Sequence, residues 1–400
     1  MKSCSRILKL LVVVGLISLG IFYGSRRPWL SLPEERGASR LLTRCVAAQA
    51  GAQEYDQIET LYGTFDIGPL VKDLLASQTM QRLKKVNQYG VWYYMRHGSD
   101  PKKLYTRYEH SVGVWALLKR YGAAVKEQIA GLLHDASHTV FSHVGDFVFK
   151  QRLGKDSYQD NIHNWYLDQG DAACILASYD IKIPEINHKS NDFALLEQPY
   201  PDLNADRLEY NLKGGLIENL IDEQDIEIIL GDLTHEDGRW FFKTPRIAAQ
   251  LAYVSLRLNK QEWGSIGNYV CYSWAARALW RAMEINEISE DEVHFSTDDI
   301  IWDRLLSSTD HVVQDNLKKM FDYDTLCTEG SHDDHDHFIC TKFTGLDPLV
   351  KQGNALVRLT SIDHAYAQAY EGTKNHVAAR YIKMSGRLAG NKDEFKECVT

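Results

Sequence analysis

The sequence predicts a mostly α-helical protein. Apolar residues recur at helical spacing through much of the chain, for example at Val125, Ile129 and Leu132. The sustained alternation of apolar and polar residues that marks half-buried strands is missing. The 400 residues are 44% hydrophobic, so they can bury a sizeable core as one large domain or two.

The N-terminus begins with a short apolar stretch. Residues 10–24 are apolar and follow Lys2, Arg6 and Lys9, which is the layout of a signal peptide or a short membrane anchor. Their length falls below the roughly 20 residues that a membrane-spanning helix needs. Residues 25–53 are rich in Arg, Ala, Gly and Ser and are predicted to be a linker. We therefore expect export or anchoring through residues 10–24, or a cytoplasmic protein if that segment is an artefact of the start site.

The elements that follow the linker are mainly helices. Residues 61–65 suggest a short strand or turn, and Pro69 opens a helix near 69–88 as a first-turn residue. Further helices are predicted near 107–121, 124–135, 140–152 and 158–178. Another begins at Asp206 and continues through Leu208, Leu212 and Leu216.

The second half of the chain contains one hairpin signal among helices. Residues 226–230 and 240–243 flank Glu236-Asp237-Gly238, which is a turn sequence. Helices are predicted near 245–259, 265–288, 297–307 and 361–385, with Ser296 or Thr297 as an N-cap. We divide the chain into residues 1–24 (signal or anchor), 25–53 (linker), 54–220 (core) and 221–400 (mainly helical C-terminal region).

Composition and motifs exclude several classes of protein. The formal net charge of −9 argues against a protein that binds nucleic acid over its whole surface. Binding through a local basic patch is not excluded by this charge. The sequence has no Gly-x-Ser-x-Gly and no Gly-Lys-Ser/Thr phosphate loop, which excludes serine-hydrolase and kinase readings. Its seven scattered cysteines form no Cys-x-x-Cys pair and predict no disulfide scaffold. If the protein is exported, Cys327 and Cys340 could close a loop.

An adjacent His-Asp pair is the strongest functional signal. His134-Asp135 ends a predicted buried helix, His110 lies upstream, and Asp206 lies downstream. Two imidazoles and two carboxylates suit a divalent transition metal with open positions for water and a phosphate oxygen. The alternative is a set of satisfied, partly buried histidines near a helix end, because buried polar groups need partners.

These motifs resemble those of the HD-domain phosphohydrolases. The resemblance rests on Gln88-Tyr89-Gly90, on Arg107-Tyr108-Glu109-His110-Ser111, on the histidine-rich segment 131–143 and on Asp206-Arg207-Leu208-Glu209-Tyr210. Within that family the chain is similar to the dNTP triphosphohydrolase branch. The resemblance implies an HD-type helical core at residues 54–220 with a small hairpin and a helical extension behind it.

The resemblance also implies a role for each matching residue. The metal ligands would be His110, His134, Asp135 and Asp206, holding Mn, Fe, Zn, Ni or Mg. The acid/base group would be His138, Asp146 and His163. Arg107 would contact substrate phosphate, and Gln88 and Tyr210 would lie on the sugar side of the pocket.

Three positions depart from the dNTP branch. Gly214 stands where that branch carries an aspartate that helps to recognise the sugar, which puts dNTP as substrate in doubt. Ala76 and Lys84 replace an Asp and an Arg of the effector-nucleotide site, so activation by a guanine nucleotide is not expected. The hydrolytic machinery matches better than the substrate pocket does.

A second His/Asp run occupies residues 331–337, with His332, His335 and His337. Such a run could hold a metal, but it follows Glu329-Gly330 and is more typical of a solvated loop.

We therefore expect a metal-dependent phosphohydrolase whose substrate is a nucleotide, foremost a dNTP cleaved to deoxynucleoside and triphosphate. One alternative is an HD phosphohydrolase that acts on other phosphomonoesters or phosphodiesters. Another is a non-catalytic HD protein that senses nucleotide or nucleic acid. The resemblance also implies a homo-oligomer, and contact with a membrane is expected only through residues 10–24.

Overall fold

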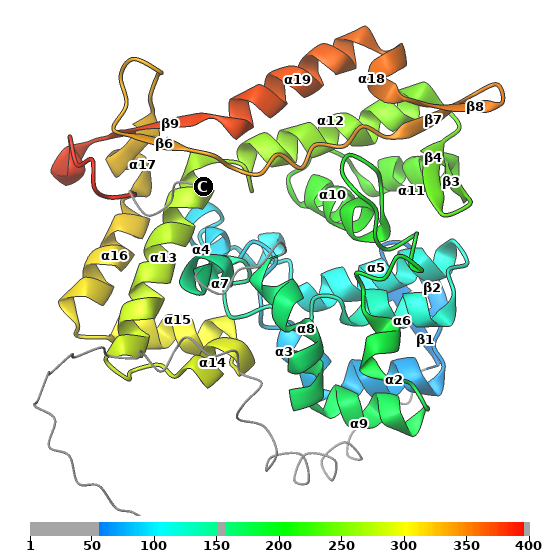
Figure 1. Ribbon diagram of the computed structural model, residues 1–400, viewed down its shortest axis with the longest axis horizontal. Helices are drawn as coiled ribbons and strands as arrows, with labels where there is room; N and C mark the ends of the chain where they lie inside the picture. Colours follow the sequence, from blue (N-terminus) through cyan, green and yellow to red (C-terminus); the bar gives the residue numbers. More distant parts are fainter. Residues whose placement is uncertain (1–55, 151–156, 396–400) are drawn as a thin grey trace, which may run out of the picture.

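The computed structural model describes residues 56–150 and 157–395 (Figure 1). Helices dominate them, which confirms the mostly α prediction. The predicted signal or anchor at 1–24 and the predicted linker at 25–53 lie outside the described residues.

The helices up to residue 220 are α2 (Pro69–Ala76), α3 (Gln78–Leu83), α4 (Trp92–Arg96), α5 (Arg107–Arg120), α6 (Val125–Leu133), α7 (Val144–Val148), α8 (Tyr158–Gln169), α9 (Asp171–Ser178) and α10 (Ala205–Ile217), with 3-10 turns η3 (Pro101–Lys103) and η5 (Ile183–Ile186). The later helices are α11 (Glu223–Asp232), α12 (Pro245–Gln261), α13 (Ile266–Glu284), α14 (Glu290–Phe295), α15 (Asp298–Ser307), α16 (His311–Phe321), α17 (Tyr323–Leu326), α18 (Leu359–Ile362), α19 (His364–Ala378) and the 3-10 turn η6 (Gly386–Leu388).

The strands form three small sheets in the described part of the chain. They are β1 (Gln57–Thr60), β2 (Gly63–Asp66), β3 (Leu233–Glu236), β4 (Arg239–Phe242), β5 (Cys327–Glu329), β6 (His337–Ile339), β7 (Leu349–Gln352), β8 (Ala355–Arg358) and β9 (Arg380–Met384). Strands β1 and β2 pair with each other, the second sheet has the order β3-β4-β7-β8, and the third has the order β5-β9-β6.

Three predicted helices are divided or shortened. The helix expected at 69–88 breaks at Ser77, which is extended and caps α3 by accepting a hydrogen bond from the Met80 backbone N–H. The helix expected at 158–178 breaks at Gly170, which is also extended. Of the helix expected at 140–152, only α7 forms before residue 150, because Phe141 and Ser142 have positive φ angles that a helix cannot contain.

The predicted hairpin exists, but its first strand begins later than expected. Residues 226–230 belong to helix α11, and β3 begins at Leu233. Asp237 and Gly238 both have positive φ, as a two-residue hairpin turn requires. The end of the helix expected at 361–385 is instead strand β9, whose residues alternate between buried and half-buried and pair with β5 and β6.

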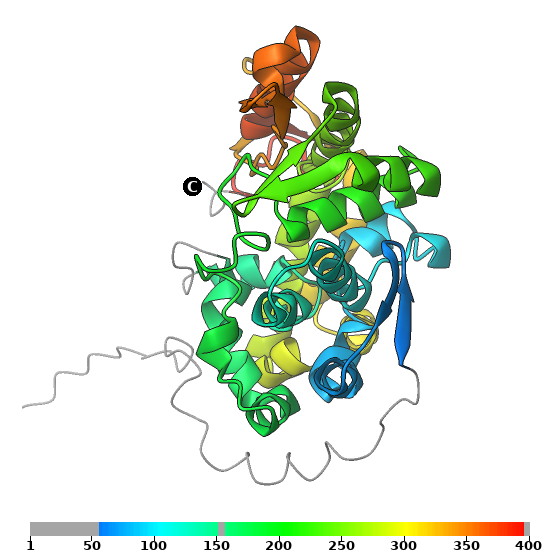
Figure 2. The same cartoon turned by 90° about the vertical axis from the view of Figure 1, so that its right-hand side faces the viewer.

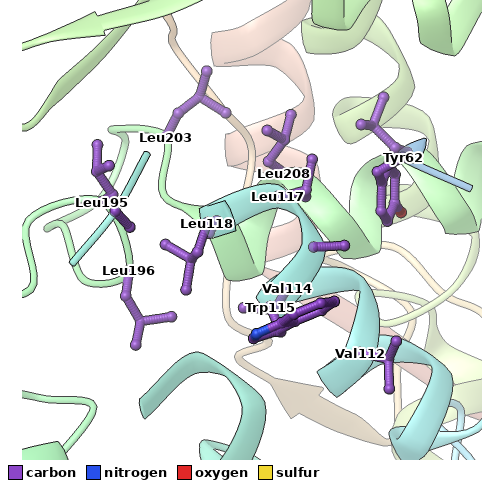
Figure 3. Close-up of a cluster of buried hydrophobic side chains, with 14 of the residues drawn as sticks. Tyr62, Val112, Val114, Trp115, Leu117, Leu118, Leu195, Leu196, Leu203 and Leu208 are labelled. Carbon is purple, nitrogen blue, oxygen red and sulfur yellow. The ribbon is translucent and has the colours of Figure 1, made fainter. Parts of the chain in front are cut away.

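Two clusters of buried side chains form the core. The first surrounds α5, where Trp115 and Leu118 pack near Leu195, Leu203 and Leu208 (Figure 3). The second is built around α13 and α16. Both clusters contain residues from either side of residue 220, so the division at that position stays a prediction. Figures 1 and 2 both place α19 on the outer side of α12, away from α5 and α6.

The predicted localisation requires a correction. Within residues 56–150 and 157–395, no helix has both the length and the apolar character needed to cross a membrane. Because residues 10–24 lie outside the described residues, no structural feature supports export or anchoring, and that prediction does not stand.

Candidate metal centre

Helix caps set the positions of the metal-ligand candidates. Thr106 and Glu109 form a capping box that starts α5 at Arg107 and places His110 on its first turn. Asn204 caps α10 by accepting from the Arg207 backbone N–H, which places Asp206 in that helix's first turn.

The structure brings three of the four predicted ligands, His110, His134 and Asp206, within reach of one ion, and Asp135 lies beside the two histidines. His110 Nε2 lies 3.1 Å from His134 Nε2 and 3.0 Å from Asp206 Oδ1. Asp135 lies 3.5 Å from His110 Nε2 and 3.4 Å from His134 Nε2. Ligand atoms about 2.0–2.2 Å from one ion lie roughly 3–4 Å apart, so His110, His134 and Asp206 fit a single divalent ion.

Hydrogen bonds on the far side of each imidazole turn its Nε2 towards the cluster. His134 Nδ1 donates to the Gly131 carbonyl at 2.7 Å, and His110 Nδ1 donates to Glu209 Oε2 at 2.5 Å. When such a ring is neutral and Nδ1 carries its proton, Nε2 is unprotonated, which is the form that binds a metal. Asp206 is the most open member of the cluster, because its side chain is 36% exposed.

Glu209 was not predicted from the sequence, although it lies within the quoted motif. It is 2% exposed and accepts hydrogen bonds from the Tyr62 hydroxyl at 2.9 Å, from the Tyr105 hydroxyl and from His110. Gly113 makes room for it, since a Cβ there would lie 2.5 Å from Glu209 Oε1. The available signal was its position three residues after Asp206, which puts both on one helix face.

Arg107 is buried and already engaged with the cluster. Its Nη1 donates to Asp135 Oδ2 at 2.6 Å, and its Nε donates to Ser142 Oγ at 3.0 Å. Burial raises the pKa of Asp135, but the charge of Arg107 and the neighbouring histidines holds it well below its usual range. The guanidinium therefore lies directly beside the cluster of predicted metal ligands.

The predicted acid/base group is only partly assembled. His138 Nε2 lies 3.2 Å from Asp135 Oδ1, and burial together with the Arg107 charge lowers the His138 pKa to about 3. Asp146 pairs instead with His143 Nδ1 at 2.9 Å, because the two residues are neighbours across the first turn of α7. The His143 ring then packs edge to face on His138.

His163 lies on α8 and is 2% exposed. Its Nδ1 is 3.1 Å from the Ser137 hydroxyl. Burial holds the pKa of His163 well below its usual range, and the neighbouring His188 and His134 lower that pKa further.

The substrate-side candidates lie at the edges of this cluster. The side-chain carbonyl of Gln88 is buried and has no donor within the described part of the chain, and its backbone carbonyl accepts weakly from Arg107. The Tyr210 ring meets Trp263 edge to face at 5.4 Å. Gly214 lies one turn further along α10, where a Cβ would be 3.2 Å from Leu258 and 3.6 Å from Trp263. Apolar side chains thus lie next to Gly214, the position at which the resemblance implied an aspartate.

The second His/Asp run does not form a comparable cluster in the described part of the chain. His332 pairs with Asp333, His335 with the Ser331 carbonyl and His337 with the Asn391 carbonyl. Ala76 and Lys84 lie at the ends of α2 and α3. Cys327 and Cys340 are both free thiols, so the loop closure considered for them is wrong in this structure.

Comparison with known proteins identifies the family. Residues 107–165 match the HD domain. The uncharacterised protein YdhJ of Bacillus subtilis is 33% identical over 235 residues, which cover 59% of this chain and 70% of YdhJ. The metal-dependent phosphohydrolase cns2 of Cordyceps militaris is 29% identical over 70% of this chain and 80% of its own length. The deoxynucleoside triphosphate triphosphohydrolase SAMHD1 of Bos taurus is 31% identical, but only 23% of this chain and 17% of that protein align.

Solved structures agree on the fold. A hypothetical protein from Aquifex aeolicus matches with a TM-score of 0.60 at 16% identity, over 80% of this chain and 98% of its own. A phosphohydrolase from Bacteroides thetaiotaomicron matches with a TM-score of 0.58 at 16% identity, over 83% of this chain and all of its own. The HD-domain match, the sequence similarity to YdhJ and cns2, and the His-His-Asp cluster show that the chain belongs to the HD-domain family of metal-dependent phosphohydrolases.

Proposed function

We propose that this phosphohydrolase acts on nucleotides, and that its leading substrate is a dNTP cleaved to deoxynucleoside and triphosphate. The observation that carries the proposal is the convergence of His110, His134 and Asp206 beside a buried arginine that is ion-paired to Asp135. The partial similarity to SAMHD1 supports the choice of substrate.

His110, His134, Asp135 and Asp206 would hold a divalent ion. Such an ion polarises a phosphoryl oxygen and lowers the pKa of a coordinated water towards neutrality. Arg107 has five N–H donors, and those not engaged by Asp135 and Ser142 can bind phosphate oxygens.

His138 and His163 have separate parts in this proposal. His138 orients Asp135 through its Nε2. His163 Nε2 is buried and has no hydrogen-bond partner among residues 56–150 and 157–395, so it can exchange a proton with the attacking water or the leaving oxygen.

A second candidate is favoured by the surroundings of Gly214. Leu258 and Trp263 occupy the space beside it, so no carboxylate on α10 meets a sugar hydroxyl at that position. A phosphomonoester or phosphodiester other than a dNTP would not need that contact. Both candidates use the same metal cluster and differ only in the substrate pocket.

Changing both His134 and Asp135 to alanine tests the metal assignment. We expect the double variant to lose turnover and bound metal while its helical circular dichroism stays close to that of the wild type. The matched control is His332→Ala with Asp333→Ala, another adjacent His-Asp pair whose side chains are 82% and 95% exposed. Residual turnover in the His134/Asp135 variant would contradict the metal assignment. An equal loss of turnover and bound metal in the control variant would contradict it too.

A product screen on the full chain tests the substrate. The protein would be supplied in turn with Mn, Fe, Zn, Ni or Mg and with dNTPs, NTPs, cyclic nucleotides and simple phosphomonoesters. Triphosphate plus deoxynucleoside is the result expected for the leading substrate. Phosphate released from monoesters alone would select the second candidate. Nucleotide binding without turnover for every metal would contradict both and indicate a sensor.

A further inference from the structure

One carboxylate from the C-terminal half of the chain reaches the segments that surround Arg107. It belongs to Asp298, the first residue of α15, which is 2% exposed. Its Oδ2 accepts from the Asn87 backbone N–H at 2.8 Å, and its Oδ1 accepts from the Phe141 backbone N–H at 2.6 Å. Asp298 therefore ties together two segments that are far apart in the sequence.

The turn at Phe141 and Ser142 needs such support. The two residues have φ angles of 59° and 57°, in the left-handed region that residues other than glycine rarely adopt. Backbone of this kind costs free energy and persists only where the surrounding contacts hold it. One such contact is the bond from Phe141 to Asp298. Another is the bond from the Val140 backbone N–H to the Val293 carbonyl at 3.0 Å. Contacts from α14 and α15 therefore hold this turn.

The same two segments hold the side chain of Arg107. Ser142 Oγ accepts from Arg107 Nε at 3.0 Å and donates to the Asn87 carbonyl. The Gln88 carbonyl accepts weakly from Arg107 Nη2 at 3.5 Å. The direction in which the guanidinium points is therefore set by contacts that lead through Asn87 and Ser142 to Asp298.

We propose that Asp298 is a positioning residue for phosphoester hydrolysis, which fixes the Arg107 guanidinium in the orientation that receives a phosphate oxygen. A guanidinium binds phosphate through a planar fork of N–H donors, so a small rotation of the fork weakens the contact. Asp298 acts on the substrate only through Arg107. This inference rests on the proposed function for the contact between Arg107 and phosphate, and it gives α15 a part in the reaction.

The experiment measures the binding of inorganic phosphate to the metal-loaded full chain by calorimetry, for the wild type and Asp298→Asn. Asparagine has nearly the same shape as aspartate. Its carbonyl oxygen can accept from one of the two backbone N–H groups, whereas its amide nitrogen, which is a donor, meets the other. We expect phosphate to bind about 10-fold more weakly, within the range of interaction energies between residues of one hydrogen-bond network.

Metal content and a neighbouring variant serve as controls. Asp298→Asn should hold as much metal as the wild type, because the segments at Asn87 and Ser142 carry none of the metal-ligand candidates. The matched control is Asp299→Asn at the next position, where the side chain is 49% exposed and pairs with Lys85. This control should bind phosphate like the wild type.

A double-mutant cycle separates the positioning of Arg107 from a general loss of structure. Arg107→Lys keeps a positive charge next to Asp135 but lacks the planar fork and the Nε–H that donates to Ser142. If Asp298 acts through Arg107, adding Asp298→Asn to Arg107→Lys should weaken phosphate binding by less than about 2-fold more. A purely structural role would make the two losses multiply.

Ser142→Ala tests the same contacts in case Asp298→Asn does not fold. It removes the oxygen that accepts from Arg107 Nε and leaves the bonds to the Asp298 carboxylate in place. We expect phosphate affinity to fall by a similar factor.

Wild-type phosphate affinity in a folded Asp298→Asn variant, or in Ser142→Ala, would overturn the inference. So would a loss of metal in Asp298→Asn, or losses that multiply in the cycle. If Arg107→Lys binds phosphate weakly and the wild type hydrolyses nucleotides, but Asp298→Asn binds phosphate normally, the inference fails and the proposed function stands. If the cycle gives the expected result but the wild type hydrolyses no nucleotide, the positioning role stands and the proposed function fails.

Discussion

Replacing Glu209 with glutamine would show how far the residues behind the ligands control metal binding. Glu209 accepts from three buried donors, the hydroxyls of Tyr62 and Tyr105 and His110 Nδ1. In glutamine, the carbonyl oxygen can take the place of Oε2 and accept from Tyr105 and His110. The amide nitrogen then faces Tyr62, whose hydroxyl can rotate to accept. The shape is kept, and only the charge that raises the basicity of His110 is lost.

We expect Glu209→Gln to weaken metal binding about 10- to 100-fold, the usual effect of losing a partner that orients a ligating histidine. That factor corresponds to roughly 1.4–2.7 kcal/mol. Glu209→Ala would be less informative, because three unsatisfied donors at about 1–3 kcal/mol each would threaten the fold itself.

The assay titrates metal-free protein with a divalent ion and follows binding by calorimetry. The matched control is Glu227→Gln, whose side chain is 59% exposed and pairs with Arg120 on the surface. Thermal unfolding monitored by circular dichroism checks that both variants fold. A folded Glu209→Gln variant with wild-type metal affinity would refute the reasoning, as would an equal loss in the control.

Two further predictions follow from the same contacts. Gly113→Ala should weaken metal binding and destabilise the fold by about 1–3 kcal/mol, because the added Cβ would lie 2.5 Å from Glu209 Oε1. Metal titration and urea unfolding measure the two effects, and wild-type values in both would contradict the prediction. Asp298 is buried, and burial raises its pKa from about 3.8 to about 7 despite hydrogen bonds from the backbone N–H groups of Asn87 and Phe141. The folded protein therefore holds a proton that the unfolded chain releases, so this group's contribution to stability falls as pH rises from about 4 to 7. The free energy of unfolding of Asp298→Asn, measured in urea across that range, should fall less steeply with pH than that of the wild type, and parallel slopes would rule out the assignment.

The sequence by itself determined the helical class and the metal-ligand candidates. Helical spacing of apolar residues is a local property, and His134-Asp135 at the end of such a helix is visible without any contact map. The helix starts at Pro69 and near Asp206 could also be predicted from the sequence, because a first-turn proline and an N-cap residue act within one turn of the helix.

The places where helices stop were harder to predict. Three segments that the sequence predicts to be continuous helices are interrupted in the structure. Ser77 and Gly170 have extended backbones, and Phe141 and Ser142 have positive φ angles. Tertiary contacts hold these bends: the Phe141 backbone N–H donates to the buried carboxylate of Asp298, more than 150 residues away. Strand β9 likewise depends on partners in β5 and β6 that no local pattern reveals.

The surroundings of the metal cluster were decided only by the tertiary structure. Tyr62, Tyr105 and Glu209 meet behind His110 from three separate segments, and His188 reaches His163 from the chain after η5. Asp146, predicted to form an acid/base group with His138 and His163, pairs with His143 because that partner lies three residues away. Sequence identifies residue types that can bind a metal, whereas the direction of each lone pair is set by hydrogen bonds between distant residues, which exist only after the chain has folded.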